Sequence, residues 1–197
     1  MVTGLVGKSC AGKDMAAEFF SSKGIPVVDV DALGHEALAA NVDRIVEAFG
    51  PGVLKDDGSV DRKRLGAVVF ADRNRLETLD GISHPWMRRQ VEAFVASHDV
   101  CMINCALLEK MELVGLCDEI LFFHAPLEVR MKRAAMRDGL DEKAFLDRDR
   151  SQREIGSTLF ECGRRVVTIL NDSDLEHLYR QLDFYYATLI GRGYVHG

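Results

Sequence analysis

The feature that most constrains the fold is the stretch GKSCAGK at residues 7–13, close to the start of the chain. It fits the pattern G-x-x-x-x-G-K, in which glycines let backbone N–H groups turn inward around phosphate oxygens. An apolar run, Val2–Val6, precedes it, and an amphipathic helical pattern, Lys13–Ser22, follows it. This strand–loop–helix context predicts a phosphate-binding loop, whereas the alternative is a glycine-rich turn without a ligand. The residues expected around the phosphates are Gly7, Lys8, Ser9, Cys10, Ala11, Gly12, Lys13, Asp14 and Met15.

The residue after Lys13 departs from the usual pattern, because Asp14 stands where a Ser or Thr hydroxyl would bind Mg²⁺. A carboxylate is also an oxygen ligand of the kind that Mg²⁺ accepts. Its charge repels the phosphates by ~4 kcal/mol at ~4 Å and an effective dielectric of ~20. Either a bridging Mg²⁺ or the extra cation Lys8 would offset this repulsion. We therefore expect nucleotide to bind mainly as its magnesium complex, with Asp14 pairing with Lys13 or capping the helix when no nucleotide is bound.

Further apolar runs predict the other strands of a five-stranded parallel sheet: Ile25–Val30, Val100–Cys105, Glu119–His124 and Arg165–Leu170. These runs are short and apolar on both faces, as buried parallel strands are. Helical patterns follow most of them, among them Leu127–Met136. A capping box at Ser173 and Glu176 predicts the start of the last helix. Alternating strands and helices indicate an α/β fold with right-handed crossovers.

Two regions interrupt this alternation within what we expect to be a single domain. Residues from about 34 to 97 form a mostly helical insertion, and residues from about 137 to 163 form a charged segment with few large apolar side chains. We expect a substrate-binding insertion and a mobile lid; the alternatives are a packed helical excursion and a solvated charged helix. The core then comprises residues from about 1 to 33, 98 to 136 and 164 to 197.

Composition and charge indicate which kinds of binding partner and which cellular location to expect. The net charge of −6 argues against broad nucleic-acid binding, which needs a basic face, although arginines gather between Arg130 and Arg165 and indicate a local anion site. No run of ~18 apolar residues predicts a membrane span, and no basic region followed by an apolar run predicts a secretory signal. The five cysteines form no C-x-x-C pair, which favours reduced thiols. We expect a cytoplasmic protein that is a monomer or a weak homo-oligomer.

Motifs along nearly the whole chain resemble the dephospho-coenzyme A kinase family, a P-loop kinase family of the nucleoside monophosphate kinase-like group. They are, in order, VVDVDALGH at 27–35, DGSVDRKRL at 57–65, SHP at 83–85, ALLE at 106–109, RDGL at 137–140, DRDRSQ at 147–152 and TILND at 168–172. The family usually has smaller residues at Lys8 and Ser9 and a Ser or Thr at Asp14. Its P-L-L-F-E motif lacks the Pro and the Phe here, where the stretch reads NCALLEK. These departures concern the nucleotide and magnesium side, and bear on rate more than on fold.

The resemblance implies a three-layer P-loop NTPase fold, ATP and Mg²⁺ as cofactors, and transfer of the ATP γ-phosphoryl group to the ribose 3′-hydroxyl of dephospho-coenzyme A. This reaction is the last step of coenzyme A synthesis. Two other hypotheses remain open. One is a related kinase of another small acceptor, such as a nucleoside monophosphate, and the other is a nucleotide- or coenzyme A-binding homologue with impaired catalysis.

On the acceptor side, the resemblance implies that Asp31 lies near the acceptor hydroxyl and orients it or takes its proton. Asp29 is the alternative, or a ligand of a magnesium-bound water; by pattern alone the two are a helix cap and a surface acid. Glu109 is expected to hold a magnesium-bound water or the acceptor ribose, unless it is a surface acid. The residues expected to bind the acceptor are Asp29, Asp31, His35, Arg62, His84, Pro85, Leu108 and Glu109.

On the donor side, Lys13 and Arg137 are the expected catalytic cations. Arg133 lies one turn before Arg137 on the same helix face, and guanidinium groups fork onto phosphate oxygens. The alternative is a solvated face paired with nearby acids. Arg148 is expected to reach the phosphates from the lid, and Asn171 to contact adenine through its amide, unless it is only a turn residue. Asp14 is the candidate magnesium ligand.

Overall fold

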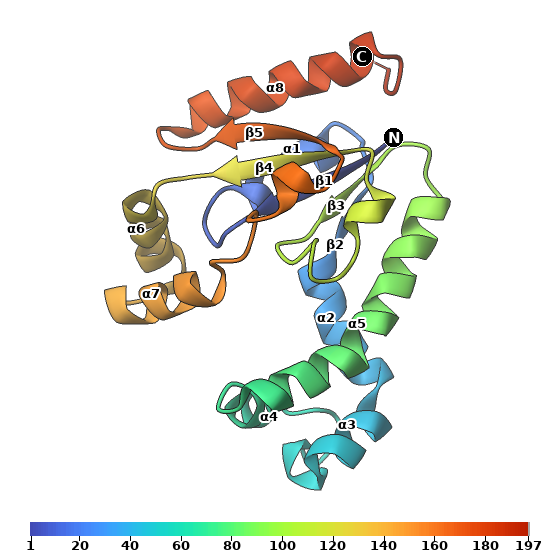
Figure 1. Cartoon of the computed structure of the whole chain (residues 1–197), viewed down its shortest axis with the longest axis vertical. Helices are drawn as coiled ribbons and strands as arrows, with labels where there is room; N and C mark the ends of the chain where they lie inside the picture. The colour runs from blue at the N-terminus through green and yellow to red at the C-terminus, as the bar shows by residue number, and fades with distance from the viewer. Residues whose placement is uncertain (197) are drawn as a thin grey trace. The chain divides into compact units, whose positions relative to one another are not determined.

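A computed structural model describes residues 1–196, and its central element is a parallel sheet of five strands in the order β2-β3-β1-β4-β5 (Figure 1). The strands are β1 (Val2–Gly7), β2 (Val27–Asp29), β3 (Cys101–Asn104), β4 (Glu119–His124) and β5 (Arg165–Leu170). All five predicted strands are present. The second and third are shorter than predicted at both ends, and the second ends at Asp29 because Val30 already begins a helix.

Helices connect most of these strands, but only a 3₁₀ turn lies between β3 and β4. The helices are α1 (Lys13–Ser22), α2 (Val30–Ala40), α3 (Val42–Phe49), α4 (Arg62–Val69), α5 (Arg73–Ala96), α6 (Leu127–Asp138), α7 (Glu142–Ser151) and α8 (Leu175–Gly191). Three short 3₁₀ turns are η1 (Pro51–Val53), η2 (Val114–Leu116) and η3 (Leu159–Glu161). Among residues 1–196, no helix is both long enough and apolar enough to cross a membrane.

The chain forms two compact units. The first, here called the core unit, comprises Met1–Asp29 and the chain from Phe94 onward, and it contains the sheet. The second, here called the helical unit, comprises Val30–Ala93. Its own small core consists of Ile45, Val53, Val60, Leu65, Val69 and Ile82.

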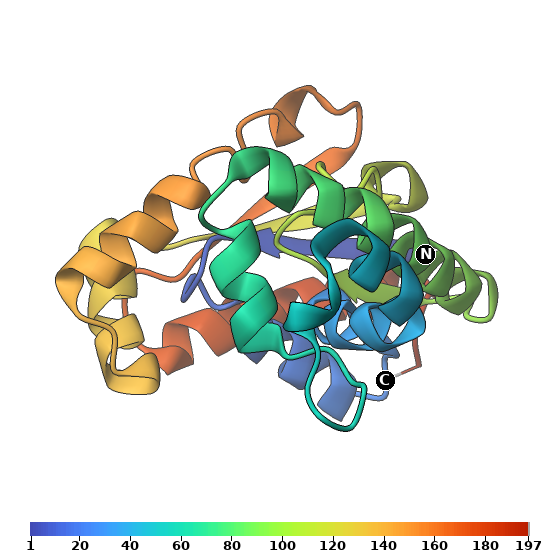
Figure 2. The same ribbon diagram turned by 90° about the horizontal axis from the view of Figure 1, so that it is seen from below.

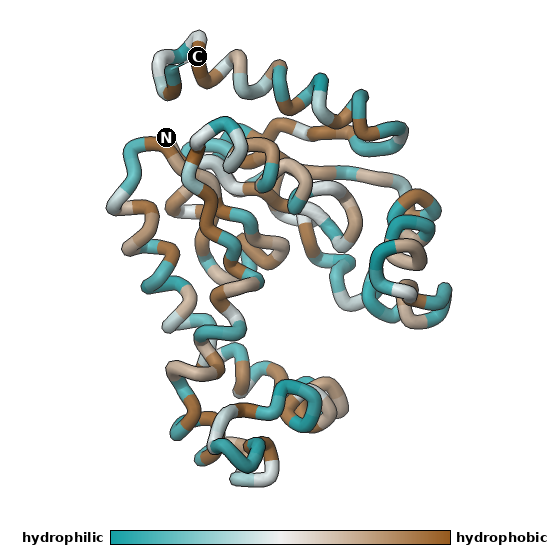
Figure 3. Tube along the Cα trace, turned by 180° about the vertical axis from the view of Figure 1, so that it is seen from behind, coloured by the Kyte–Doolittle hydropathy of each residue, from teal (hydrophilic) through white to brown (hydrophobic). Residues whose placement is uncertain are grey.

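In the core unit, α1 and α8 pack against one face of the sheet. Leu5, Leu121 and Phe123 point to that face, because side chains alternate along a strand. Phe20 from α1 and Leu182 from α8 complete this apolar cluster, and both are buried. The alternation of hydrophilic and hydrophobic residues along α8 is visible in Figure 3. The packing of these helices holds the carboxyl ends of β1 and β3 in place for the site described below.

The N-terminal cap of α8 differs from the prediction by one residue. Asp174, not Ser173, is the cap: it has an extended backbone, and its carboxylate accepts a hydrogen bond of 2.8 Å from the His177 N–H. Ser173 lies outside the helix and offers its backbone carbonyl to Arg133 instead. The predicted capping residue was therefore wrong, and the helix begins one residue later than the motif indicated.

Replacing this cap tests the assignment. We expect Asp174→Ala to lower the free energy of unfolding by ~1 kcal/mol, since it leaves an N–H at the helix start without its acceptor. Ser173→Ala is the matched control and should change the free energy far less. Urea denaturation followed by circular dichroism measures both, and equal effects of the two variants would contradict the assignment.

Candidate nucleotide site

The phosphate loop connects β1 to α1 and is tightly turned. The Ala11 N–H donates to the Lys8 carbonyl at 3.0 Å, and Cys10 and Gly12 both have a left-handed backbone. At Gly12, a Cβ would lie 2.2 Å from the Asn171 side-chain nitrogen, so only glycine fits there. The first turn of α1 points its free N–H groups into the loop, where they favour an anion.

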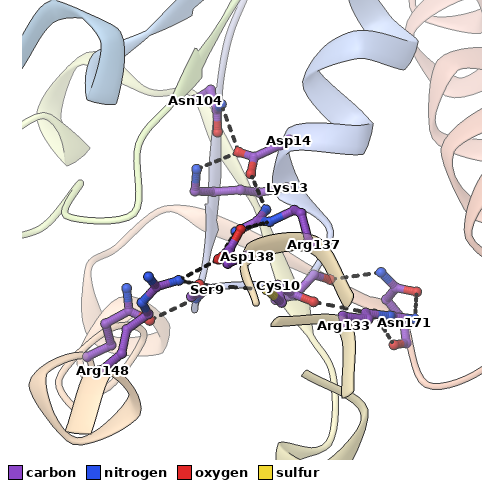
Figure 4. A network of polar contacts seen from close by, with 12 residues as sticks. Ser9, Cys10, Lys13, Asp14, Asn104, Arg133, Arg137, Asp138, Arg148 and Asn171 are labelled. Carbon is purple, nitrogen blue, oxygen red and sulfur yellow. Dashed lines mark hydrogen bonds and ion pairs between the residues drawn. The ribbon is translucent and has the colours of Figure 1, made fainter. Parts of the chain in front are cut away.

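Asn171 and Arg133 hold this loop from outside (Figure 4). The Asn171 amide nitrogen donates to the Ala11 carbonyl at 3.0 Å, and its amide oxygen accepts from Arg133 Nη2 at 2.9 Å. Arg133 Nη1 also donates to the carbonyls of Cys10 and Asn171, at 3.4 and 3.1 Å. Asn171 is only 3% exposed, so its bond to the Ala11 carbonyl is buried, and losing a partner there is costly.

These contacts bear on two expectations from the sequence. Contact of the Asn171 amide with adenine stays a prediction, and it would require this side chain to exchange a bond that now holds the loop. Contact of Arg133 with transferring phosphates also stays a prediction, because its guanidinium group is directed at backbone carbonyls of the loop and of the chain after β5.

Asp14 lies between two cations at the start of α1. Its carboxylate accepts from Lys13 Nζ at 2.7 Å and from the Asn104 amide nitrogen at 3.3 Å, and it lies 3.6 Å from Arg137 Nη1. The expected pairing of Asp14 with Lys13 is confirmed. Burial alone would raise the pKa of Asp14, but the charge and hydrogen bond of Lys13, helped by Asn104 and Arg137, hold that pKa below its usual value. Asp14 is therefore ionised at neutral pH.

Sequence reasoning missed Asn104 as a site residue. It is the last residue of β3, paired in register with Leu5 of β1 and Asp29 of β2. Its place at the carboxyl end of a buried strand, where ligands gather in open α/β sheets, was the available signal.

The segment expected to be a lid begins with a second series of charged side chains, which connects to the loop. Arg137 Nε donates to Asp138 at 2.8 Å, and Arg148 Nη1 donates to the same carboxylate at 2.8 Å. Hydrogen bonds from Arg137 and Arg148 lower the pKa of Asp138 to about 2. Arg148 also lies 3.4 Å from the Ser9 hydroxyl. The segment is thus linked to the loop, and α6 and α7 lie side by side in both Figure 1 and Figure 2.

Helix α7 contacts the loop at two further points. The Gln152 amide oxygen accepts from the Ser9 N–H at 2.8 Å, and Lys8 Nζ pairs with Asp149 at 3.4 Å. Asp149 also pairs with Arg130 Nη2 at 2.7 Å, and Arg130 is only 5% exposed. The sequence analysis did not single out Asp138, Asp149 or Arg130. Asp138 pairs with Arg148 and Asp149 pairs with Arg130, and these partners are 10 and 19 residues apart along the chain.

A cavity of about 460 Å³ opens beside the loop. This volume is in the range of small-molecule sites. Its walls combine residues at the loop, two of the three arginines of α6, the polar side chains of Glu18 and Asn171, and apolar side chains. The lining residues are Cys10, Gly12, Asp14, Met15, Glu18, Arg133, Met136, Arg137, Asn171 and Leu175.

The donor groups of this site fit a bound Mg²⁺. Residues 1–196 contain no group of three or more His, Cys, Asp or Glu side chains arranged to hold a metal by themselves. Mg²⁺ in phosphate sites, however, is commonly held by only one or two protein groups together with the substrate phosphates. Asp14 supplies an ionised oxygen at the loop, and next to it the buried Asn104 amide oxygen has no hydrogen-bond partner.

The profile of the dephospho-CoA kinase family matches residues 1–175. The chain belongs to the dephospho-CoA kinase family. A dephospho-CoA kinase from Thermosynechococcus vestitus is 33% identical over 197 residues, which cover 96% of this chain and 95% of that protein. The family is named for the ATP-dependent phosphorylation of dephospho-CoA in coenzyme A synthesis, and this is the activity that membership gives the chain.

Solved structures agree on the fold. A protein of known structure from Thermus thermophilus has a TM-score of 0.79 at 29% identity and covers 96% of this chain and 97% of its own. The dephospho-CoA kinase from Campylobacter jejuni has a TM-score of 0.72 at 22% identity, with 98% of each chain covered. At that identity the second likeness shows the fold alone. The expected α/β kinase fold with a five-stranded parallel sheet is confirmed.

Two acceptor-side candidates of this dephospho-CoA kinase family member belong to the core unit near β3. Leu108 is fully buried and lies where a Cβ on Gly4 would touch it. The Glu109 carboxylate accepts from the Gly156 N–H at 3.1 Å and from the Thr158 hydroxyl. Glu109 therefore anchors the segment after α7, and its expected contact with a magnesium-bound water or a ribose stays a prediction.

The other acceptor-side candidates lie in β2 or in the helical unit. Asp29 ends β2 in the core unit. The rest lie in the helical unit: Asp31 and His35 in α2, Arg62 at the start of α4, and His84 and Pro85 in α5. His84 Nε2 lies 3.4 Å from the Asp80 carboxylate one turn earlier. The core unit thus brings together the donor-side residues, while most acceptor-side residues share the helical unit.

Removing the Asn171 side chain tests how the loop is held. We expect Asn171→Ala to weaken binding of a non-hydrolysable ATP analogue by about tenfold or more, since the buried Ala11 carbonyl loses its donor and Arg133 an acceptor. Asp172→Ala, at the exposed neighbouring position, is the matched control and should bind as the wild type does. Isothermal titration calorimetry gives the affinities, and unchanged affinity of a folded Asn171→Ala variant would contradict the prediction.

Proposed function

We propose that this protein transfers the γ-phosphoryl group of ATP, bound with Mg²⁺, to the ribose 3′-hydroxyl of dephospho-CoA. The observation that carries the proposal is the convergence of Lys13, Asp14 and Arg137 at a glycine-containing loop beside a cavity of about 460 Å³. Phosphoryl transfer asks mainly for positioning and neutralisation of charge, and this cluster supplies both. We place the reaction in the cytoplasm, where ATP is available.

On the donor side, the phosphates of ATP would form ion pairs with the cations that now pair with Asp14. Lys13 Nζ and the Arg137 guanidinium group are both bound to this carboxylate, so they already converge on one negatively charged group. Asp14 would hold Mg²⁺, which supplies neutralisation of the phosphate charge. The nucleoside fits the cavity beside the loop, whose apolar walls include Met15, Met136 and Leu175.

On the acceptor side, Asp31 is the proposed group that orients the ribose hydroxyl or takes its proton, with Asp29 as the alternative. His35, Arg62, His84 and Pro85 are the other acceptor-binding residues proposed in the helical unit. In the core unit, Leu108 and Glu109 are the proposed acceptor-binding residues, in the segment that follows β3.

The segment from about 137 to 163 is the proposed lid. Arg148 and Gln152 already contact Ser9 of the loop, which supports a role for α7 in covering the phosphates. Closure of such a segment excludes water and so limits hydrolysis of ATP without transfer.

A panel of acceptors tests the proposed function. ADP formation from ATP should depend on dephospho-CoA and remain near background with nucleoside monophosphates, because the acceptor groups belong to a dephospho-CoA kinase. A coupled assay for ADP measures the rates, and mass spectrometry identifies the product. Turnover of a nucleoside monophosphate instead would favour a related kinase, and binding without turnover would favour an impaired homologue.

Substitution of each acceptor-side aspartate tests which one acts at the hydroxyl. We expect Asp31→Asn to lower kcat by about 100-fold or more, the usual contribution of a positioned acid or base, while ATP affinity stays near that of the wild type. Asp29→Asn, which removes the carboxylate two residues earlier, is the matched comparison with a smaller effect on kcat. The reverse order of the two effects would assign the role to Asp29.

A further inference from the structure

The Asp14 carboxylate at the loop and the Asn104 amide at the end of β3 differ from the usual magnesium ligands of P-loop enzymes. In P-loop enzymes a neutral Ser or Thr hydroxyl after the lysine and an aspartate from a neighbouring strand hold Mg²⁺ together. In this chain Asp14 follows the lysine, and Asn104 ends the strand that pairs with β1. The charged group and the neutral group thus stand in exchanged places.

We propose that Asp14 and Asn104 together form the magnesium site of this chain, with the carboxylate supplied by the loop helix and the neutral oxygen by the strand. The proposal rests on the proposed function in that it takes Mg–ATP as the ligand. It adds Asn104 as a positioning group for the metal and explains how an aspartate is tolerated after Lys13.

The two side chains come from different elements and meet directly. The Asn104 amide nitrogen lies 3.3 Å from Asp14 Oδ1, the same oxygen that accepts from Lys13 (Figure 4). Asn104 is only 2% exposed, so its amide is held in place rather than solvated. A cation bound to Asp14 would therefore lie next to this amide.

The unused oxygen of Asn104 is the second observation. Among the described residues, Asn104 Oδ1 is the one buried side-chain oxygen that has no hydrogen-bond partner. Buried polar atoms in proteins are nearly always paired, so an unpaired one calls for a ligand or a change of orientation. Rotation of the amide about its last bond exchanges nitrogen and oxygen, and it directs the oxygen at a cation beside Asp14.

The charges explain why the amide has its present orientation. With no cation, an N–H on the Asp14 carboxylate is favoured, because an oxygen there would face a second oxygen. With Mg²⁺ present, an oxygen is favoured, either as a ligand or as the acceptor of a metal-bound water. The pair offers the metal one carboxylate and one neutral oxygen, the same total charge as the usual hydroxyl and aspartate.

A swap of the two side chains tests the proposal on the full chain. The variants are Asp14→Ser, Asn104→Asp, the double variant with both changes, and Asn104→Leu, which keeps the size of the side chain but has no oxygen. Calorimetry measures the affinity of a non-hydrolysable ATP analogue with Mg²⁺ and with a chelator. Electron paramagnetic resonance measures Mn²⁺ binding to the protein–nucleotide complex.

We expect Asp14→Ser to lose about tenfold or more in metal affinity, and the double variant to regain most of that loss, because the carboxylate is restored on the strand. Asn104→Leu should weaken metal binding while the metal-free affinity for the nucleotide analogue stays near that of the wild type. That metal-free affinity also shows that the variant is folded.

Two results would overturn the proposal. One is a double variant whose metal affinity is no better than that of Asp14→Ser alone, and the other is an Asn104→Leu variant with wild-type metal affinity. Neither readout involves an acceptor. A failed acceptor panel with a successful swap would therefore reject only the proposed function, and the opposite pair of results would reject only the exchanged site.

Discussion

The hydrogen bond from the buried Asn171 amide to the Ala11 carbonyl is the contact on which the donor site depends. It joins the chain after β5 to the loop after β1, and it is possible only because Gly12 has no side chain to fill the space beside it. Arg133 completes the connection by binding both segments. Because Arg133 belongs to α6, these hydrogen bonds connect the loop to that helix and place its cations beside the phosphate site.

Alternating charges extend from this anchored loop. Lys13, Asp14, Arg137, Asp138 and Arg148 form a continuous series of ion pairs in the core unit. Each cation that a phosphate would need is therefore already matched by a carboxylate of the protein. When nucleotide binds to such a site, the phosphates replace protein carboxylates as the partners of the cations. The net binding free energy then depends on Asp14, whose charge must be neutralised again once Lys13 binds the phosphates. The proposed magnesium site of Asp14 and Asn104 would supply this neutralisation.

The fold was largely predictable because its signals are local. Apolar runs of five or six residues predict the strands of a buried sheet, as at Glu119–His124, and the loop motif predicts the first crossover. The cap of α8 was misplaced by one residue, because Ser173 and Asp174 are both good caps and only the backbone decides between them. In the site, Lys13, Asp14 and Arg137 were predicted and do lie together. Asn104, Asp138 and Asp149 were missed, because each contacts a residue ten or more positions away along the chain.

By itself the sequence determined the loop, the order of strands and helices along the chain, and the family. Each of these depends on short motifs whose residues are close together along the chain. Only the tertiary structure decided what the polar side chains contact. It assigned Asn171 and Arg133 to holding the loop, linked Glu109 to the segment after α7, and brought Asn104 next to Asp14 across 90 residues of chain. The physical reason is that a hydrogen bond or an ion pair depends on distance in space, and distant segments become neighbours only when the sheet packs.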